Sequence, residues 1–588
     1  MGAGTNAGGE LSVEELKVAL EQLRAELEQL RAENRRLAEE IGLLRGDDAS
    51  WNDVKDCLRS RLLAALALRL PPKKESESEC DRLRRRAKEQ REAKKRRAAA
   101  RGAADPRRRG RGKRKPRPPF VADETIEIHV PAAELPADAA PNGFVERHFY
   151  GMSIVRHNVL IRLHEYVSPA EGRIIAKLPE GWRGEFTPDT HVTVDTLSMG
   201  GMTEPKIKEL FADHGVRVSA GQINNVLLAT ADKLRDEQLA AHRAGIENSP
   251  SIGIDGTHTT CDGEPMVCHI LGNEVFTSMT TTEHKDRVTV IGVLAGAPVG
   301  HCVGEHALAH QDLTMAAREL LRRVSDGEPV CDGADQELLD LSSELRTTGL
   351  DAAKMDRFLD RAIPDAVQGV RRHIREATAG QWLRTVITCL PLVMLADGGT
   401  NYHGILAFLQ LCWIHMLRPF SLLPESADGT RVLFEGWALY RRLCAWRDVR
   451  DAAEATAIAV EFDRVFDPER CTDASVRRQL GLTRTHKAQL LTVLHHRHVP
   501  PENNGQERGA KARVRKGDIR FGPRSARGLR AWDTMQSVVG TLRKLRISPA
   551  AFMADRITRQ RRFEPLDTIV KRECIRRYGP PAPTPGTF

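Results

Sequence analysis

The chain has 588 residues, 41% of them hydrophobic, and its 89 Lys and Arg against 80 Asp and Glu give a net charge of +9. This length allows three or four domains with at least one large core. The sequence has no run of about 18 or more apolar residues and no apolar signal core, which excludes membrane and secreted proteins. We therefore expect a cytoplasmic, nucleoid-associated protein. The eleven cysteines include no C-x-x-C pair, which indicates a reducing compartment and argues against a four-cysteine zinc module.

Residues 1–50 are expected to form a dimerisation helix. Between residues 11 and 45, one core position of a heptad repeat carries leucine at seven-residue intervals. These leucines are Leu16, Leu23, Leu30, Leu37 and Leu44. Asn34 is the polar residue at the other core position, and this combination favours a parallel two-stranded coiled coil in fixed register. The pattern predicts a homodimer, and an amphipathic helix packed on its own protein is the alternative.

Residues 51–121 are expected to form a short helix followed by a basic, disordered linker. Between Asp81 and Arg117 there are 19 Lys or Arg against four acids, a net charge of +15 that leaves −6 for the rest of the chain. This excess predicts contact with DNA phosphates through counterion release, and a solvated linker is the alternative. The candidate contacts are Arg107, Arg108, Arg109, Arg111, Lys113, Arg114 and Lys115.

Residues 122–199 have strand-like alternation and predict a small β-rich module of unassigned role. Residues 200–245 predict a helix-turn-helix, with a first helix over 204–214, a turn at Gly215 and Ser219 as N-cap of a second helix to about Leu234. Near the start of that second helix lie Gln222, Asn224 and Asn225. Their amides could pair with adenine in a major groove, and two plain packed helices are the alternative.

Two acids follow apolar, strand-like runs. The stretch from Ser251 to His258 predicts a short buried strand that ends at Asp255, where Gly256 turns the backbone away. A second predicted strand, over 392–396, leads to Asp397. Further strands are expected over 266–271 and 275–281. Helices are expected over 304–385, from Tyr402 to 415, over 430–495 and over 532–554, and the tail after residue 580 is expected to be disordered.

A third acid, Glu507, opens a strongly basic segment. Its lysines and arginines are Arg508, Lys511, Arg513, Arg515 and Lys516. They are expected to position DNA by phosphate contacts, and a solvated helix face is the alternative. Cys412 and His415 are three residues apart on one predicted helical face. They could form half of a metal site, although a packed thiol with a hydrogen-bonded histidine is the more ordinary interpretation.

The chain resembles bacterial insertion-sequence transposases of the DDE type, most closely the insertion-sequence 66 family. The resemblance rests on the leucine repeat and on three sequence blocks. The blocks are Asp397-Gly-Gly-Thr-Asn-Tyr with the later Cys412-Trp-Ile-His415, Asn503-Asn-Gly-Gln-Glu-Arg508, and Gly528 through Trp532-Asp-Thr to Ile547-Ser-Pro549. Two departures stand out. No cysteine lies between Cys80 and Cys261, so we predict no zinc module there, and Asp255 is followed by Gly-Thr-His where relatives have Glu-Thr.

The resemblance implies an α/β multidomain protein with a ribonuclease-H-like catalytic core over 246–429 and 496–560, a helical insertion over 430–495 and a basic tail over 561–588. It implies that Asp255, Asp397 and Glu507 hold two Mg²⁺ or Mn²⁺ ions, which suits hard cations and phosphodiester cleavage. Glu502 and Asp332 are alternative ligands. The expected activity is cleavage of terminal inverted repeats and joining of the 3′ ends to target DNA. A larger synaptic complex and small accessory proteins of the same element are expected partners. A non-catalytic dimeric DNA-binding regulator and a nuclease without strand transfer are the alternatives.

Overall fold

The computed structural model describes residues 122, 124–128, 147, 154–170, 172–182, 184–330, 335–423 and 426–580. The predicted coiled coil and basic arm, and with them all seven candidate arm contacts from residue 107 to residue 115, lie outside these residues. The chain divides into two compact units. One comprises the described residues between 410 and 502, and the other comprises the remaining described residues.

The larger unit is built on a five-stranded mixed sheet, which confirms the predicted mixed α/β class. The strand order is β5 (Thr277–Thr282), β4 (Glu264–Gly272), β3 (Ser251–Cys261), β8 (Val393–Ala396) and β9 (Phe408–Leu411). The first three form an antiparallel meander, whereas β3 and β8 are parallel. At the edge strand β9 the chain passes into the other unit.

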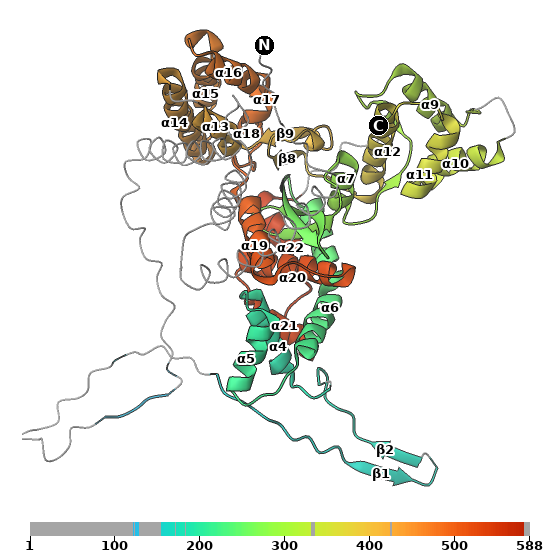
Figure 1. Ribbon diagram of the computed structural model, residues 1–588, viewed down its shortest axis with the longest axis vertical. Helices are drawn as coiled ribbons and strands as arrows, with labels where there is room; N and C mark the ends of the chain where they lie inside the picture. Colours follow the sequence, from blue (N-terminus) through green and yellow to red (C-terminus); the bar gives the residue numbers. More distant parts are fainter. Residues whose placement is uncertain are drawn as a thin grey trace, which may run out of the picture. The chain divides into compact units, whose positions relative to one another are not determined.

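Alternating side chains give the sheet two packed faces. Ile254 of β3 and its cross-strand partner Leu271 of β4 lie in the main hydrophobic core, together with residues of several helices. These helices include α6 (Ala220–Glu247), α7 (Arg287–Ala295), α12 (Gln368–Val386), α20 (Ala526–Leu545), α21 (Pro549–Thr558) and α22 (Leu566–Tyr578). On the other face, Ile270 packs with Ala510 of α19 (Asn504–Arg520), and Figure 1 shows α19 beside the green strands.

Helix α20 covers the exposed edge of β5 with polar side chains. The backbone N–H groups of Thr277, Met279 and Thr281 donate hydrogen bonds of 3.1, 2.8 and 2.8 Å to α20 side chains. The acceptors are Thr541, Ser537 and Asp533. They lie four residues apart, so they share one helix face and match alternate N–H groups of the strand. The backbone N–H groups along this sheet edge thereby find acceptors without a further strand.

The end of the chain is structured further than the sequence suggested. A basic tail was expected from residue 561, but α22 occupies much of it and buries Leu566, Val570 and Cys574 in the main core. Apolar residues at spacings of four give this helix a stripe that can pack. Within the segment 561–588, residues 581–588 lie outside the described part of the chain.

A helical subdomain lies between β5 and β8 in the sequence. It has its own core, which includes Leu321, Leu345 and Phe358. Its elements are β6 (Gly300–His301), α8 (Glu305–Leu308), α9 (Met315–Asp326), α10 (Gln336–Thr347), β7 (Leu350–Asp351) and α11 (Ala352–Ala362). The helices expected over 304–385 are therefore present, interrupted by the two-residue strand β7.

Ahead of the sheet lies a three-helix bundle. Helices α4 (Pro188–Met199), α5 (Glu204–Asp213) and the start of α6 share a small core around Ile207, Phe211 and Ile223. The predicted turn and second N-cap agree with the structure, because Gly215 has φ +74° and Ser219 caps α6. The second helix runs to Glu247, well past the predicted end.

The expected β-rich module is a single hairpin among the described residues of 122–187. Its strands are β1 (Glu165–Ser168) and β2 (Gly172–Ile175), which protrude at the bottom of Figure 1. Of the stretch from residue 155 to 167, where alternation also predicts a strand, the last three residues lie in β1 and the rest form no strand; Val155 and Leu160 are strongly exposed. An alternation of apolar and polar residues does not form a sheet where no neighbouring strand or hydrophobic core is present to pair or pack with it.

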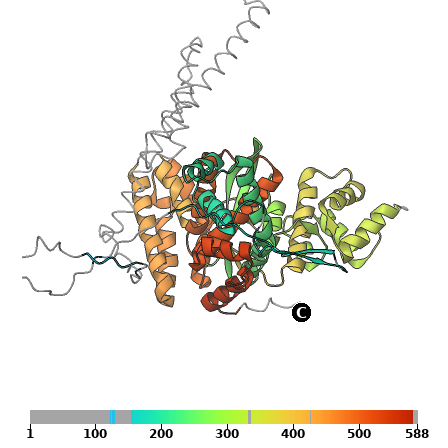
Figure 2. The same cartoon turned by 90° about the horizontal axis from the view of Figure 1, so that it is seen from below.

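The other unit, in its described part, is helical apart from the last two residues of β9. Its helices are α13 (Trp413–Leu422), α14 (Ala427–Val449), α15 (Ala452–Val465), α16 (Ala474–Thr485), α17 (Lys487–Leu490) and α18 (Thr492–His495), with the short 3₁₀ helix η4 (Pro468–Arg470). Figure 2 shows them, in orange, side by side. Trp413 is fully buried, lies against Phe462 at a centroid distance of 5.9 Å and donates its indole N–H to the Leu490 carbonyl at 2.8 Å. The helices of this unit thus begin with α13 at Trp413, ahead of the helices expected from residue 430.

The helix predicted from Tyr402 to residue 415 is wrong. A short 3₁₀ helix, η3 (Thr400–Tyr402), is followed by the strand β9, and α13 begins only at Trp413. Phe408 donates its N–H to the Leu392 carbonyl at 2.9 Å, which draws this segment onto the sheet beside β8. Tertiary pairing thus overrides the local apolar pattern.

Candidate active site

The first predicted acid, Asp255, lies within a strand and not at its end. β3 continues to Cys261, and Gly256 remains paired with His269 of β4. The expected turn at Gly256 is therefore wrong. The glycine instead makes room for a lysine, because a Cβ at position 256 would lie 2.9 Å from Lys285 Cε. Asp255 is half-buried, and its Oδ1 accepts a hydrogen bond of 2.9 Å from the Gly256 N–H.

The second acid, Asp397, directly follows β8. The parallel register pairs Gly253 of β3 with Leu395 of β8. Continuing this register by two residues brings Asp255 alongside Asp397. The Gly399 N–H donates to Asp397 Oδ1 at 3.3 Å, which helps to orient the carboxylate in the loop after the strand.

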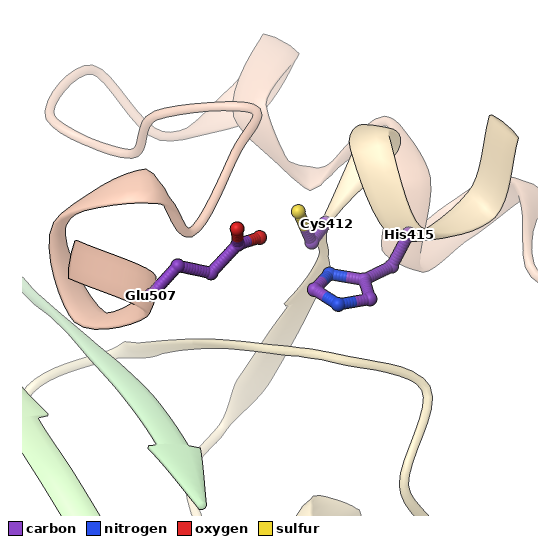
Figure 3. A group of neighbouring side chains, drawn as sticks. All are labelled: Cys412, His415 and Glu507. Carbon is purple, nitrogen blue, oxygen red and sulfur yellow. The ribbon is translucent and has the colours of Figure 1, made fainter. Parts of the chain in front are cut away.

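The third acid, Glu507, lies in the first turn of α19, as Figure 3 shows. Two buried amides fasten this turn to the sheet. Asn503 Nδ2 donates to the Ile254 carbonyl at 2.7 Å, and Gln506 Nε2 donates to the Gly272 carbonyl at 2.6 Å. Because Ile254 immediately precedes Asp255, these bonds bring the start of α19 to the strand that carries the first acid. They give the Asn503–Arg508 block a physical role.

The charges of the three carboxylates interact. Burial, and after it the negative charges of Asp397 and Glu507, raise the pKa of Asp255 to about 6, whereas the Gly256 N–H and Lys285 oppose the shift. Burial, followed by Asp397 and Asp255, also raises the pKa of the Tyr402 phenol above its usual range. The structure therefore brings the three predicted acids into one electrostatic cluster.

Such a cluster has the chemistry of a site for hard divalent cations. Its donors are carboxylate oxygens, which Mg²⁺ and Mn²⁺ prefer, and a bound cation would relieve the repulsion that raises the pKa of Asp255. Among the described residues, Asp255, Asp397 and Glu507 together do not form a group whose ligand atoms all lie within 4.8 Å of one another. A wider spread of carboxylates suits two ions about 3.5–4 Å apart better than one.

Lys285 and Tyr402 are neighbours of the cluster that the sequence did not indicate. Lys285 Nζ lies 5.3 Å from the centroid of the Tyr402 ring, within cation–π range. Lys285 comes from the loop between β5 and α7, and Tyr402 from η3. Their only sequence signal is the tyrosine that ends the Asp397 block, since a single lysine in a loop carries no pattern.

Of the two alternative acids, the structure describes Glu502. Glu502 belongs to the other unit and accepts a hydrogen bond of 2.9 Å from the Tyr440 hydroxyl. Asp332 lies outside the described residues. The pair Cys412 and His415 also belongs to the other unit. Figure 3 shows both at the start of α13, with Cys412 buried and its sulfur within 4.8 Å of an imidazole nitrogen of His415.

The five basic residues after Glu507 divide into two sets. Arg508, Lys511 and Arg515 are exposed at helical spacings that put them on one face of α19, which we term the α19 basic face. Arg513 and Lys516, in contrast, are buried. Their assignment as phosphate contacts is therefore wrong, because buried side chains cannot reach a nucleic acid.

Arg513 and Lys516 instead connect α19 with α20. The Arg513 guanidinium pairs with Asp533 at 3.0 Å and donates to Thr281 Oγ1 at 3.0 Å. Both cations lie over the Trp532 ring, at 5.2 Å for Arg513 and 4.7 Å for Lys516. Burial lowers the pKa of Lys516 well below its usual value. A tryptophan beside an aspartate thus stabilises the helix that carries Glu507.

The three amide residues predicted to contact DNA in the helix-turn-helix differ in whether their side chains are already hydrogen-bonded within the protein. Asn224 and Asn225 are exposed in the first turns of α6. Gln222 serves as a cap: its Oε1 accepts from the Ser219 N–H at 2.9 Å, while Ser219 Oγ accepts from the Gln222 N–H at 3.1 Å. Gln222 can read a base only by giving up this capping box, so the two asparagines are better placed for contact.

A second group of potential ligands, His310, Asp312 and Glu376, lies in and beside the helical subdomain. Its carboxylates already have a cationic partner. Arg287 Nη1 lies 3.3 Å from Asp312 and 2.7 Å from Glu376. This group is accounted for by an ion-pair network between α7 and α12.

No family model matches the chain. The chain is similar to the uncharacterized protein y4jO of Sinorhizobium fredii, with 26% identity over 322 residues that cover 53% of this chain and 94% of that protein. Among the residues that the structure describes, no helix is both long and apolar enough to cross a membrane.

Proposed function

We propose that the protein is a DDE-type DNA transposase, which cleaves the terminal inverted repeats of a mobile element and joins the freed 3′ ends to target DNA. One observation carries the proposal. Asp255, Asp397 and Glu507, separated by about 250 residues of sequence, come from β3, β8 and α19, and the charges of the latter two raise the pKa of the first. Clustered acids with perturbed pKa values are typical of functional sites.

The topology supports a ribonuclease-H-like core. An antiparallel meander continues into a parallel strand, and the two aspartates lie on β3 and directly after the adjacent parallel strand β8. A helix from much later in the chain supplies the glutamate. The helical residues 410–502 lie between the second and third acids in the sequence, as the proposed insertion requires.

In the proposed mechanism Asp255, Asp397 and Glu507 would hold two divalent cations beside the scissile phosphate. When bound, the ions would stabilise the attacking and leaving oxygens of an in-line displacement. In the first step a water oxygen bonds to phosphorus and the 3′-oxygen of the element end leaves. In the second, that 3′-hydroxyl attacks a target phosphate and displaces the target's own 3′-oxygen. The α19 basic face positions the backbone beside Glu507.

Recognition of the element ends is assigned to the three-helix bundle. Exposed amides at Asn224 and Asn225 offer hydrogen bonds to base edges. The basic arm of residues 81–117 supplies sequence-independent affinity, and residues 11–45 pair two copies through the predicted coiled coil.

The test uses the full-length protein, Mg²⁺ and a labelled duplex that carries the inverted repeats flanking the gene. The wild type is expected to nick the ends and to yield joined products. Asp397→Asn removes one charged ligand and should abolish both reactions while it leaves DNA binding intact. Asp365→Asn changes an exposed aspartate of the helical subdomain and serves as the matched control.

The other outcomes identify the rival functions. Nicks without joining would indicate a nuclease. A bound but uncut duplex would indicate the non-catalytic dimeric regulator. Undiminished cleavage by Asp397→Asn would exclude that residue as a ligand and overturn the proposed site.

A further inference from the structure

The turn between α19 and α20 holds an aromatic ring out in solvent. Phe521 is 82% exposed, although its large apolar side chain would favour burial. Its backbone is in the left-handed region, with φ 58°, a conformation that costs a residue with a Cβ about 1–2 kcal/mol. The conformation is fixed by a hydrogen bond of 2.7 Å from the Phe521 N–H to the Gly517 carbonyl, which ends α19.

The base of this turn is anchored to the sheet. Asp262, at the tip of the β3–β4 hairpin, donates its N–H to the Pro523 carbonyl at 2.9 Å. Gly522, with φ +80°, lies so close to β3 that a Cβ there would be 3.0 Å from the Thr260 carbonyl oxygen. The exposed ring therefore stands on a rigid support and not on a loose loop.

The surroundings of the ring are basic and connect two functional regions. The α19 basic face leads from Glu507 toward the turn, and Arg524 beyond it is exposed. At the same end of the helix, Arg520 donates to Glu204 Oε1 at 2.9 Å and to the Met202 carbonyl, at the start of α5. One end of α19 thus carries the third acid, and the other end touches the three-helix bundle.

Helix geometry sets the separation along this path. Fourteen residues separate Glu507 from Phe521, which at 1.5 Å per residue is about 21 Å. Base pairs in B-DNA are about 3.4 Å apart, so this length corresponds to roughly six base-pair steps.

We propose that Phe521 is a wedge that stacks on a nucleobase of the bound element end, about six base pairs from the phosphate cleaved beside Glu507. The inference rests on the proposed function. Apolar wedges inserted between base steps unstack and bend duplex DNA, and aromatic rings stack on bases irrespective of sequence. The α19 basic face before Phe521 and Arg524 after it hold the phosphates on either side, so the ring meets the bases at a fixed distance from the acids.

The test scans the inverted-repeat duplex with 2-aminopurine, one position at a time, in the absence of divalent cation so that binding is separated from cleavage. With wild type, fluorescence is expected to rise at one step about six base pairs from the cleaved phosphate, because the base there loses a stacking neighbour. Phe521→Ala should abolish the rise and weaken binding about 5- to 150-fold, with an unchanged salt dependence. Phe521→Trp should restore both.

Two controls separate stacking from other effects. Arg515→Ala removes a phosphate contact, so it should lower the slope of log affinity against log salt by about one and keep the fluorescence rise. Met315→Ala removes an apolar side chain that is 91% exposed in the helical subdomain and should change neither. Thermal unfolding of Phe521→Ala should match wild type, since its side chain is largely in solvent.

Unaltered affinity and fluorescence in Phe521→Ala would overturn the wedge and leave the transposase proposal standing. A wedge signal in a protein that fails to cut with Mg²⁺ would support the wedge and overturn the transposase. Failure of wild type to bind the duplex would overturn both.

Discussion

The close approach of α19 to β3 at Gly253 can be tested by adding one methyl group. A Cβ at position 253 would lie 2.6 Å from Gln506 Cδ and 2.8 Å from Asn503 Oδ1, closer than non-bonded atoms come. Both side chains are buried and hydrogen-bonded to sheet carbonyls, so neither can move without breaking its bond. Gly253→Ala should therefore push the first turn of α19, and with it Glu507, away from Asp255.

The expected cost follows from these contacts. Overpacking a buried site costs about 1–3 kcal/mol, and each buried hydrogen bond contributes about 1 kcal/mol net. We expect the free energy of opening α19 to fall by about 2–3 kcal/mol, which corresponds to a 30- to 150-fold loss of amide protection. Hydrogen exchange followed by mass spectrometry over residues 504–520 measures this quantity directly.

Gly517→Ala is the matched control on the same helix. A Cβ there has nothing within 4 Å, and alanine favours a helix over glycine by up to about 1 kcal/mol. Protection of α19 should then rise or stay constant. Wild-type protection in Gly253→Ala would refute the reasoning, because it would mean that α19 does not depend on its contact with β3.

Three further predictions concern charge and pH. The pKa of Asp255 is raised from 3.8 to about 6, so the stability contributed by its protonated carboxyl is lost as pH rises through 6. Because Mg²⁺ binds the ionised carboxylate, Mg²⁺ should raise Tm more at pH 7 than at pH 4.5. Equal gains in Tm at the two pH values would contradict a cation bound by this group. Burial lowers the pKa of His269 from 6.5 to about 4, so stability should fall on acidification between those values by about 1.4 kcal/mol per pH unit. His269→Gln should flatten that slope in urea titrations at pH 7 and pH 5, and an unchanged slope would reject the assignment. Arg513→Ala leaves Asp533 buried without its cation and should destabilise by about 3–5 kcal/mol in urea, whereas the exposed Arg515→Ala should stay within about 0.5 kcal/mol. Similar losses for both arginine variants would show that burial does not distinguish them.

The sequence anticipated those elements whose local pattern and tertiary role coincide. The stretches leading to Asp255 and Asp397 are apolar, and both form strands that have a neighbour on each side in the sheet. Ser219 is both a favourable N-cap residue and the observed start of α6. The block around Glu507 is recognisable in the sequence as a motif. Its physical reason, the two amides that fasten α19 to the sheet, required coordinates, because it depends on carbonyls about 230–250 residues away.

The sequence-based predictions are wrong where long-range contacts determine the secondary structure or the burial of a side chain. Residues 402–411 have an apolar pattern that suits a helix, but pairing beside β8 makes part of them a strand. Arg513 and Lys516 belong to a run of charges that suggests a solvated face, yet helical rotation turns them toward Trp532 and Asp533. Charge composition alone carries no information on which face of a helix meets a neighbour.

The order in which the chain supplies its three acids has a consequence for protein synthesis. The ribosome delivers the first two acids by residue 397, but the third arrives only after the helical segment 410–502 has been made. α20 and α22, which close the sheet edge and the main core, come later still. A nascent or prematurely terminated chain therefore lacks the complete carboxylate set, and incomplete translation products cannot bring the three acids together.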